Sequence, residues 1–169
     1  EHVGADVNDV SIGMGYDERI APAFLKAGLG WGGSCFPKDT IALLQLAKDY
    51  SYHMPIIEAA RQVNAAQVEL IASKILRELK TLQGKKIALL GISFKPLTDD
   101  VRNSPAIDVA FRLQGLGAQV YMHDPICLEN ARKVYEKSGL HFVDTVEEAA
   151  TDAQCVALVT DWQQYRKLD

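Results

Sequence analysis

The pattern of apolar positions divides the chain into a helical first half and an alternating second half. Apolar residues recur at three- and four-residue steps over about 37–50 and over 55–82, which predicts two amphipathic helices after the short helical or irregular pieces of 1–34. Pro37 and Pro55 suit the first turns, where an N–H is unpaired in any case. The second helix has no internal glycine and would be about 40 Å long. A helix of this length typically joins domains or packs on a partner chain.

Residues 85–169 alternate between short apolar runs and helical patterns. The runs KIALLGI, QVYMHD and CVALVT, with a weaker HFV, have the composition of buried parallel strands. Helical segments are expected near 105–116, 128–138 and 145–151. This order predicts an α/β fold with a doubly wound, Rossmann-like parallel sheet, which binds ligands at the carboxyl ends of its strands. We therefore expect an all-helical central domain over 1–84, with its long connecting helix, and a Rossmann-like domain over 85–169.

The composition excludes several classes of protein. Of the 169 residues, 48% are hydrophobic and 24% are charged, and the net charge is −4. Lysine and arginine form no run longer than two and no apolar run could cross a bilayer, so we expect neither nucleic acid nor membrane as a partner. The first residues contain neither an initiator methionine nor a signal peptide, which suggests a piece of a longer protein. Three widely spaced cysteines form no CxxC motif, so we expect no disulfide, no metal site and a cytoplasmic location.

The stretch GLGWGGSCFPKD, residues 28–39, places a cysteine between a glycine-rich loop and a helix start. If the helix begins at Pro37, Cys35 lies at its N-terminus, where unpaired N–H groups and the helix dipole favour a thiolate. The glycines let backbone amides approach a ligand without a Cβ in the way. Asp39, one turn later on the same face, could orient a water toward a group bound to the sulfur. It would also oppose the thiolate, so Lys38 and the helix terminus must outweigh it.

These residues also have plainer interpretations. A lone cysteine is often a small buried hydrophobic residue, and this is what we expect of Cys127 and of Cys155. For Cys35, the glycines, the helix start and the following acid together favour the functional interpretation. Trp31 either belongs to the core, which its spacing slightly favours, or forms the wall of a ligand pocket.

A second loop, GISFKPLTDDVRNSP, follows the first strand and is longer than is usual in such folds. It is not GxGxxG, so it does not indicate a dinucleotide cradle. Lys95 and Arg102 are the residue types that balance phosphate charge, although a solvated charged turn is an equally good interpretation. Asp124, at the end of VYMHD, either binds a ribose hydroxyl or forms an Asp-Pro turn.

Together these stretches resemble the nucleotide-sugar 6-dehydrogenase family. VGADVNDV, DERIAPAFLKAGLGWGGSCFPKD and SFKPLTDDVRNSPA occur in the family's order, and GGSCFPKD is a specific motif. The resemblance implies an NAD-binding domain ahead of this chain, a homodimer built on the long helix, and a second Rossmann-like domain that binds UDP. The family's GxGxxG, its catalytic lysine and asparagine and its final strand are missing from the sequence. We therefore expect the chain alone to be inactive.

The resemblance also assigns roles by position. Cys35 would be the nucleophile and Asp39 the acid that assists hydrolysis. Arg19 would reach a substrate held by the neighbouring subunit, and Arg102 would approach NAD. The residues expected to contact substrate are Arg19, Phe24, Lys26, Ala27, Gly28, Leu29, Gly30, Trp31, Gly32, Phe94 and Lys95.

The reaction that the resemblance implies is the NAD-dependent four-electron oxidation of UDP-glucose to UDP-glucuronate. NAD accepts two electrons at a time, so the intermediate aldehyde must be held. A thiolate can hold it as a thiohemiacetal, a second oxidation gives a thioester, and water then releases the acid. Two alternatives stay open: GDP-mannose or another nucleotide sugar as substrate, and a non-catalytic module that binds nucleotides and dimerises.

Overall fold

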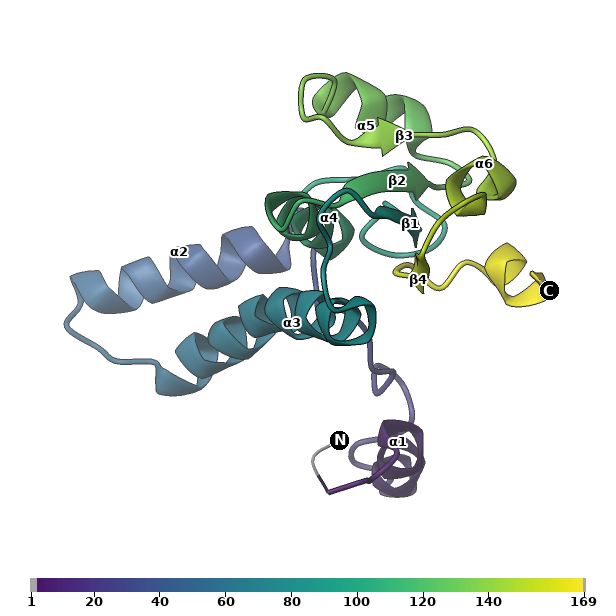
Figure 1. Cartoon of the computed structure of the whole chain (residues 1–169). Coiled ribbons are helices and arrows are strands. Elements are labelled where there is room, and N and C mark those ends of the chain that lie inside the picture. Colours follow the sequence, from purple (N-terminus) through teal and green to yellow (C-terminus); the bar gives the residue numbers. More distant parts are fainter. Residues whose placement is uncertain (1–2, 169) are drawn as a thin grey trace.

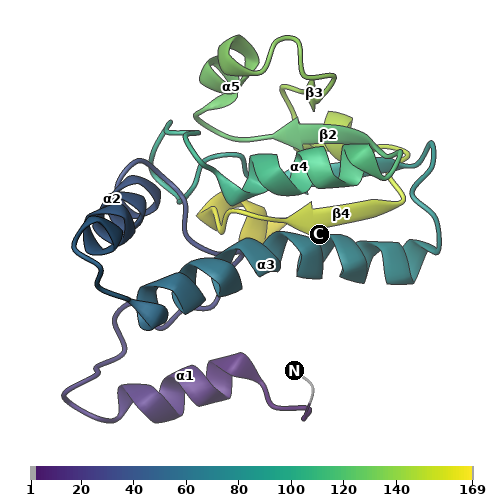
Figure 2. The same cartoon turned by 90° about the vertical axis from the view of Figure 1, so that its left-hand side faces the viewer.

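The structure is a computed structural model that describes residues 3–168, and its first half consists of three α-helices. α1 (Val7–Gly15) lies apart from the others, joined to them by the segment that carries the glycine loop (Figures 1 and 2). α2 (Phe36–Asp49) and α3 (Pro55–Leu79) form an antiparallel hairpin that projects from the body of the molecule. Both predicted helices are confirmed, and each begins within one residue of its proline.

The second half is an α/β unit around a parallel sheet of four described strands in the order β3-β2-β1-β4. Because the chain enters at β1, moves to one edge and returns to the other, its helices cover both faces. This is the doubly wound fold that the sequence predicts. The strands are β1 (Lys86–Leu90), β2 (Gln119–His123), β3 (His141–Phe142) and β4 (Cys155–Leu158); the helices are α4 (Pro105–Gly115), α5 (Leu128–Val134), α6 (Val146–Ala150) and the 3₁₀ helix η1 (Gln163–Lys167).

Alternate residues of β1 belong to two different apolar clusters. Ile87 and Leu89 pack with residues of α3 and α4, whereas Ala88 and Leu90 pack with residues of α6 and η1. All four are at most 3% exposed, which is the pattern of a strand covered on both faces. Since the last turns of α3 belong to the first cluster, the long helix is shared by both halves of the chain. The division into domains at residue 84 stays a prediction.

Two helices end earlier than their patterns predict. α3 ends at Leu79 rather than at 82, because Lys80 takes a left-handed conformation (φ 66°) and the chain turns so that Leu82 is buried. α5 ends at Val134 rather than at 138, and Tyr135 packs against the core from outside the helix. In both cases an apolar side chain that continues the helical spacing is used for tertiary packing instead.

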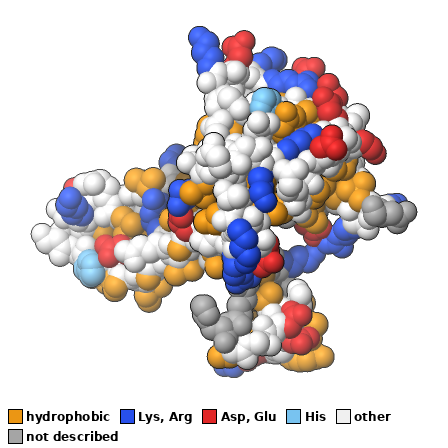
Figure 3. Space-filling model, in the orientation of Figure 1, with side chains coloured by type: hydrophobic (Ala, Val, Ile, Leu, Met, Phe, Trp, Pro, Cys, Tyr) orange, Lys and Arg blue, Asp and Glu red, His pale blue; other side chains and the backbone are white. Residues whose placement is uncertain are grey.

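The helical half leaves much apolar surface uncovered. α1 has no buried residue, and hydrophobic side chains gather over it and along the α2–α3 hairpin (Figure 3). Apolar surface of this extent is typical of contact with another protein surface. In the described part of the chain, no helix combines the length and the apolar character that crossing a membrane requires. The large hydrophobic residues of these helices that are at least 49% exposed are Val7, Val10, Ile12, Phe36, Ile41, Leu46, Ile56 and Val63.

Asp124, at the carboxyl end of β2, is a fully buried carboxylate that ties three segments together. Burial alone would raise the pKa of Asp124, but the backbone N–H groups that bind it hold this pKa below its ordinary value. With both oxygens saturated by its own chain, the side chain is an anchor for turns, and the ribose interpretation is not supported. Its Oδ2 accepts hydrogen bonds from the N–H groups of Ile92 (2.8 Å) and Ser93 (3.0 Å), the Ser93 hydroxyl (3.0 Å) and the Trp162 indole (3.2 Å), and its Oδ1 accepts from the N–H groups of Ile126 (3.0 Å) and Cys127 (3.1 Å).

The substitution Asp124→Asn should lower the free energy of unfolding by about 2–4 kcal/mol. An asparagine has only one side-chain oxygen. Its NH₂ group would therefore replace Oδ1 or Oδ2 and would face N–H donors, which it cannot accept. Urea unfolding followed by circular dichroism measures the effect, and Asp99→Asn, at an exposed loop position, is the control. Because folding lowers the pKa of Asp124, its contribution is present above the ordinary carboxyl pKa and is lost as the pH falls through the folded value. The difference between wild type and variant should therefore shrink in acid, and equal unfolding midpoints for both variants at neutral pH would contradict the anchor.

Candidate active site

Cys35 is the N-cap residue of α2 and its side chain is exposed. The helix begins there because Pro37 occupies its first turn and the N–H of Asp39 donates to the Cys35 carbonyl at 2.8 Å. The thiol makes no capping hydrogen bond; it lies 3.8 Å from the Ser34 hydroxyl. A buried, merely structural role is therefore wrong for Cys35. It holds for Cys127, which is 0% exposed.

The charged groups beside Cys35 are paired with one another. Lys38 Nζ lies 2.7 Å from Asp39 Oδ1, and both side chains are exposed. This hydrogen bond raises the pKa of Lys38 above its ordinary value, and the nearby Cys35 acts in the same direction. Asp39 is thus one turn from the sulfur, as predicted, with its charge balanced by its neighbour.

Two glycines of the loop pack against the second half of the chain. A Cβ at Gly32 would lie 2.2 Å from the Asn103 carbonyl oxygen, and one at Gly33 would lie 2.8 Å from the Phe94 ring. The Gly33 N–H donates to the Arg102 carbonyl at 3.0 Å, and Asn103 Nδ2 donates to the Gly33 carbonyl at 3.2 Å. The sequence predicts that the glycines leave the loop accessible to a ligand. In the structure, Gly32 and Gly33 instead allow the glycine loop to pack closely against the loop after β1.

A cavity of about 320 Å³ lies where the glycine loop meets the carboxyl ends of β1 and β4. In a doubly wound sheet this edge is where ligands bind. Six residues predicted to contact substrate line the cavity, together with others that the sequence did not single out. The predicted six are Lys26, Gly28, Leu29, Gly30, Phe94 and Lys95; the others are Ser93, Pro96, Ser104, Pro105, Ala106, Val159, Thr160 and Asp161.

The electrostatics of this cavity suit an anion. Lys26 and Lys95 line it, and the N-terminus of α4 faces it through the backbone at Ser104, the N-cap residue. Pro105 has no N–H and the Ala106 N–H donates to the Ser104 hydroxyl, so the helix contributes the positive end of its dipole here rather than free donors. The carboxylate in the lining, Asp161, is paired with Arg166 at 2.8 Å, which balances its charge.

Two models of one family match most of the chain. The central domain of the UDP-glucose/GDP-mannose dehydrogenase family matches residues 1–66, and the UDP-binding domain of the same family matches residues 88–169. The chain belongs to this family. Both matched regions meet at the cavity, since the glycine loop comes from the first and the loop after β1 from the second.

Similar proteins carry consistent names. UDP-glucose 6-dehydrogenase of Rhizobium meliloti is 45% identical over 170 residues, covering 100% of this chain and 38% of the relative. YwqF, a UDP-glucose 6-dehydrogenase of Bacillus subtilis, is 43% identical over 167 residues, covering 99% and 38%. Among solved structures, a UDP-glucose dehydrogenase from Pyrobaculum islandicum superposes with a TM-score of 0.95 at 37% identity, over 100% of this chain and 39% of that one. A GDP-mannose dehydrogenase from Pseudomonas aeruginosa gives a TM-score of 0.74 at 28% identity, over 96% and 39%. The chain thus spans well under half the length of these family members.

The remaining predicted residues lie outside the cavity. Arg19 is 88% exposed in its side chain and pairs with Asp17 at 2.6 Å, and Phe24 is fully exposed with a φ of 64°. Ala27 borders a separate recess between the loop and α3. Arg102 is exposed and pairs with Asp100 at 2.8 Å.

Two further observations place residues around Cys35. The hydrogen bonds with Asp100 raise the pKa of Arg102 above its ordinary value, and Cys35 contributes in the same direction, so the guanidinium lies within electrostatic reach of the sulfur. Trp31 is half-buried and lines an apolar cavity of about 280 Å³ together with Phe36, whose ring centre is 6.2 Å away. Trp31 is therefore not part of the core, and because the cavity that it lines is separate from the one at the sheet edge, its predicted contact with substrate stays a prediction.

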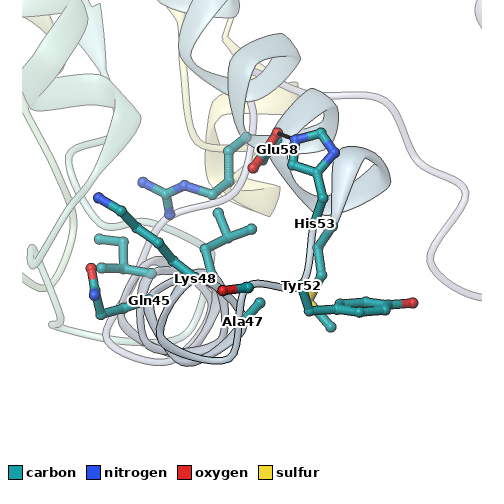
Figure 4. Close-up of a pocket in the computed structure, with 11 residues that line it drawn as sticks. Gln45, Ala47, Lys48, Tyr52, His53 and Glu58 are labelled. Carbon is teal, nitrogen blue, oxygen red and sulfur yellow. Dashed lines mark ion pairs between the residues drawn. The ribbon is translucent and has the colours of Figure 1, made fainter.

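A larger pocket, of about 540 Å³, lies at the far end of the α2–α3 hairpin and contains none of the predicted site residues (Figure 4). His53 and Glu58 lie side by side at one side of it, and their side chains pair at 3.0 Å. Lys48 and Tyr52 lie on other sides of the same pocket. In the described residues, no group of three or more potential metal ligands occurs here or elsewhere. The candidate active site is therefore the glycine loop with its cavity and its cysteine.

Iodoacetamide should label Cys35 well before the other two cysteines at neutral pH. Burial raises the pKa of the Cys127 thiol and of the Cys155 thiol, whereas Cys35 is exposed at a helix N-terminus. Mass spectrometry of tryptic peptides measures the three rates, and Cys35→Ser should remove the fast phase alone. Equal, slow labelling at all three positions would count against an activated thiol.

Proposed function

We propose that this chain is the substrate-binding and cysteine-bearing part of an NAD-dependent UDP-glucose 6-dehydrogenase. The observation that carries the proposal is the connection between cavity and thiol. One short loop contributes Gly28 and Gly30 to an anion-binding cavity at the sheet edge, and five residues after Gly30 it presents an exposed cysteine at a helix N-terminus. Membership of the family and the names of its relatives support UDP-glucose as the substrate.

In this proposal the nucleotide lies in the cavity and the sugar extends toward Cys35. Lys26, Lys95 and the N-terminus of α4 neutralise the diphosphate. Lys95 Nζ also lies 5.3 Å from the centre of the Phe94 ring, so the ring and the ammonium form one wall of the site. The exposed backbone of Gly28, where a Cβ would meet nothing within 4 Å, leaves room for the ligand.

The cysteine holds the intermediate aldehyde. The thiolate of Cys35 adds to the aldehyde carbon, and the new C–S bond gives a thiohemiacetal whose carbon carries a hydride to lose. Loss of that hydride, with loss of the hydroxyl proton to solvent, gives a thioester. A water oriented by Asp39 then attacks the thioester carbon and gives up its protons, the C–S bond breaks, the thiolate is regenerated and the carboxylate leaves. Asp39 must exchange Lys38 for the water in this last step.

NAD would accept the hydride in each of the two oxidations. The described residues do not form a dinucleotide cradle, because the loop after β1 lacks the glycine pattern that a pyrophosphate needs. Arg102 would contact the cofactor, and the support for this is that its side chain is exposed and interacts electrostatically with Cys35. The rest of the NAD site would belong to other parts of the protein.

The proposal includes a homodimer built on α3. Its support is the apolar surface of the helix, where Ile56 and Val63 are 83% and 62% exposed. In such a dimer, Arg19 and Phe24, which contact little of their own chain, would face the site of the neighbouring subunit. A second substrate, GDP-mannose, stays an alternative because a GDP-mannose dehydrogenase shares the fold.

Lys95→Ala should weaken binding of UDP-glucose about tenfold, since a charge-assisted contact to phosphate is lost from a partly enclosed site. Isothermal titration calorimetry of residues 1–169 with UDP-glucose and with GDP-mannose measures this. Lys137→Ala, which removes an exposed lysine outside the cavity, is the matched control. Tighter binding of GDP-mannose than of UDP-glucose would favour the alternative substrate.

Residues 1–169 alone should not reduce NAD in the presence of UDP-glucose. The cysteine and the cavity are present, but the residues that hold the nicotinamide against the sugar are not among them. NADH absorbance measures turnover, and the same chain fused behind the NAD-binding domain of a relative should be active. Turnover by residues 1–169 at the rate of a longer family member would contradict the proposal that NAD is held by other parts of the protein.

A further inference from the structure

Asn64 binds the backbone of the glycine loop with both ends of its side-chain amide. It lies on α3, and its Oδ1 accepts the Trp31 N–H at 2.8 Å while its Nδ2 donates to the Trp31 carbonyl at 3.2 Å. One side chain thus satisfies both backbone groups of a single residue, as a neighbouring strand would. These hydrogen bonds are partly buried.

The backbone of Trp31 can reach Asn64 only because the residue before it, Gly30, has no side chain. Gly30 has a φ of +117°, and a Cβ there would lie 2.6 Å from Asn64 Oδ1. Gly30 lines the cavity, and the ring of Trp31 packs 6.2 Å from that of Phe36, the residue after Cys35. Asn64 therefore holds the segment that connects the cavity to the cysteine.

The loop is held from its other side as well. Asn103 donates to the Gly33 carbonyl at 3.2 Å, and the Gly33 N–H donates to the carbonyl of Arg102. α3 thus fixes Trp31 and the loop after β1 fixes Gly33, two residues later, in a segment whose glycines would otherwise be costly to order. Of the two contacts, the one from α3 depends entirely on a side chain, so it can be removed by substitution.

We propose that Asn64 is a positioning residue that sets the place of Cys35 relative to the substrate cavity. This inference rests on the proposed function, since it assumes that the cavity and the thiol act on one substrate. A displacement of the attacking group by about 1 Å can cost a hundredfold in rate. The nucleotide cavity itself keeps its lysines and the α4 terminus without Asn64. The loss should therefore appear in kcat more than in KM.

Two substitutions separate positioning from packing. Asn64→Asp keeps the shape but replaces the donor with a carboxylate oxygen that faces the Trp31 carbonyl, so it repels the loop. Asn64→Ala removes both hydrogen bonds without repulsion. In the longer protein that carries this chain, we expect kcat for UDP-glucose to fall about 10- to 100-fold, with Asp worse than Ala. If volume alone mattered, Ala would be worse than Asp, and that order would overturn the proposal.

The matched control is Gln114→Glu. Gln114 is also partly buried and also donates from its side-chain amide to a backbone carbonyl, that of Ser138 at 3.1 Å, but it lies near the C-terminal end of α4, whereas the cavity is at the N-terminal end of that helix. Its loss should leave kcat within about twofold of wild type. A fall in kcat as large as that for Asn64→Asp would show a general effect of removing such amides and would overturn the assignment.

Hydrogen exchange of residues 1–169 tests the clamp independently of activity. The Trp31 amide should exchange at least about tenfold faster in both Asn64 variants, while Gly33, held by the other loop, should change less. Unchanged exchange at Trp31 would overturn the proposal whatever the kinetics. If the longer wild-type protein does not oxidise UDP-glucose, the proposed function fails, and faster exchange at Trp31 with altered Cys35 alkylation would still support the positioning of the cysteine.

Discussion

The site depends on one close approach: the glycine loop lies directly against the loop after β1. At Gly32 the approach leaves no room for a Cβ, which would lie 2.2 Å from the Asn103 carbonyl oxygen. Any side chain there would push the two loops apart, and with them the cysteine and the cavity wall. The contact thus joins a helical unit, which carries Cys35, to a sheet, whose edge lines the cavity.

The loop after β1 offers a fixed surface to the glycine loop because hydrogen bonds to Asp124 hold its first residues in place. Asp124 takes the N–H groups of Ile92 and Ser93, so the chain leaves β1 in a set direction. Ser104 then closes the loop by donating to the Ile92 carbonyl at 2.5 Å and capping α4. A buried carboxylate is stable only when its lone pairs are used, and two of the donors to Asp124 come from segments that line the cavity: Ser93 lines it and Trp162 follows Asp161, which also lines it. The anchor and the cavity thus share these two segments.

Much of this could be predicted from sequence, because apolar spacing and proline position are local signals. The position of Cys35 at the N-cap of α2 followed from Pro37, and the strands followed from their apolar runs. The end of α3 could not be predicted, since Leu82 continues the helical spacing but is drawn into the sheet's core. Asn64 was missed for a related reason: a polar residue in a long amphipathic helix reads as solvent-facing until the loop that covers it is known.

The role of Asp124 could not be predicted from the sequence either. Its position at a strand end fits a ligand contact as well as a turn, and only the donors gathered around it decide between them. Ser93 and Thr160, which line the cavity, gave no signal because small polar residues at strand ends are common. The cavity as a whole was predictable only through the motifs that the chain shares with its family.

The charges around Cys35 give the arrangement its chemical logic. A carboxylate one turn from a thiol opposes ionisation of that thiol, yet hydrolysis of the thioester needs a carboxylate to orient the attacking water. In the structure Asp39 is paired with Lys38, so its opposition to the thiolate is balanced while the thiol is free. When Asp39 turns to the water in the proposed hydrolysis, Lys38 is released beside the sulfur, which is then leaving as a thiolate. The ion pair between Lys38 and Asp39 can therefore be formed while the thiolate adds to the aldehyde and broken while water attacks the thioester. The helix N-terminus favours the sulfur anion in both steps.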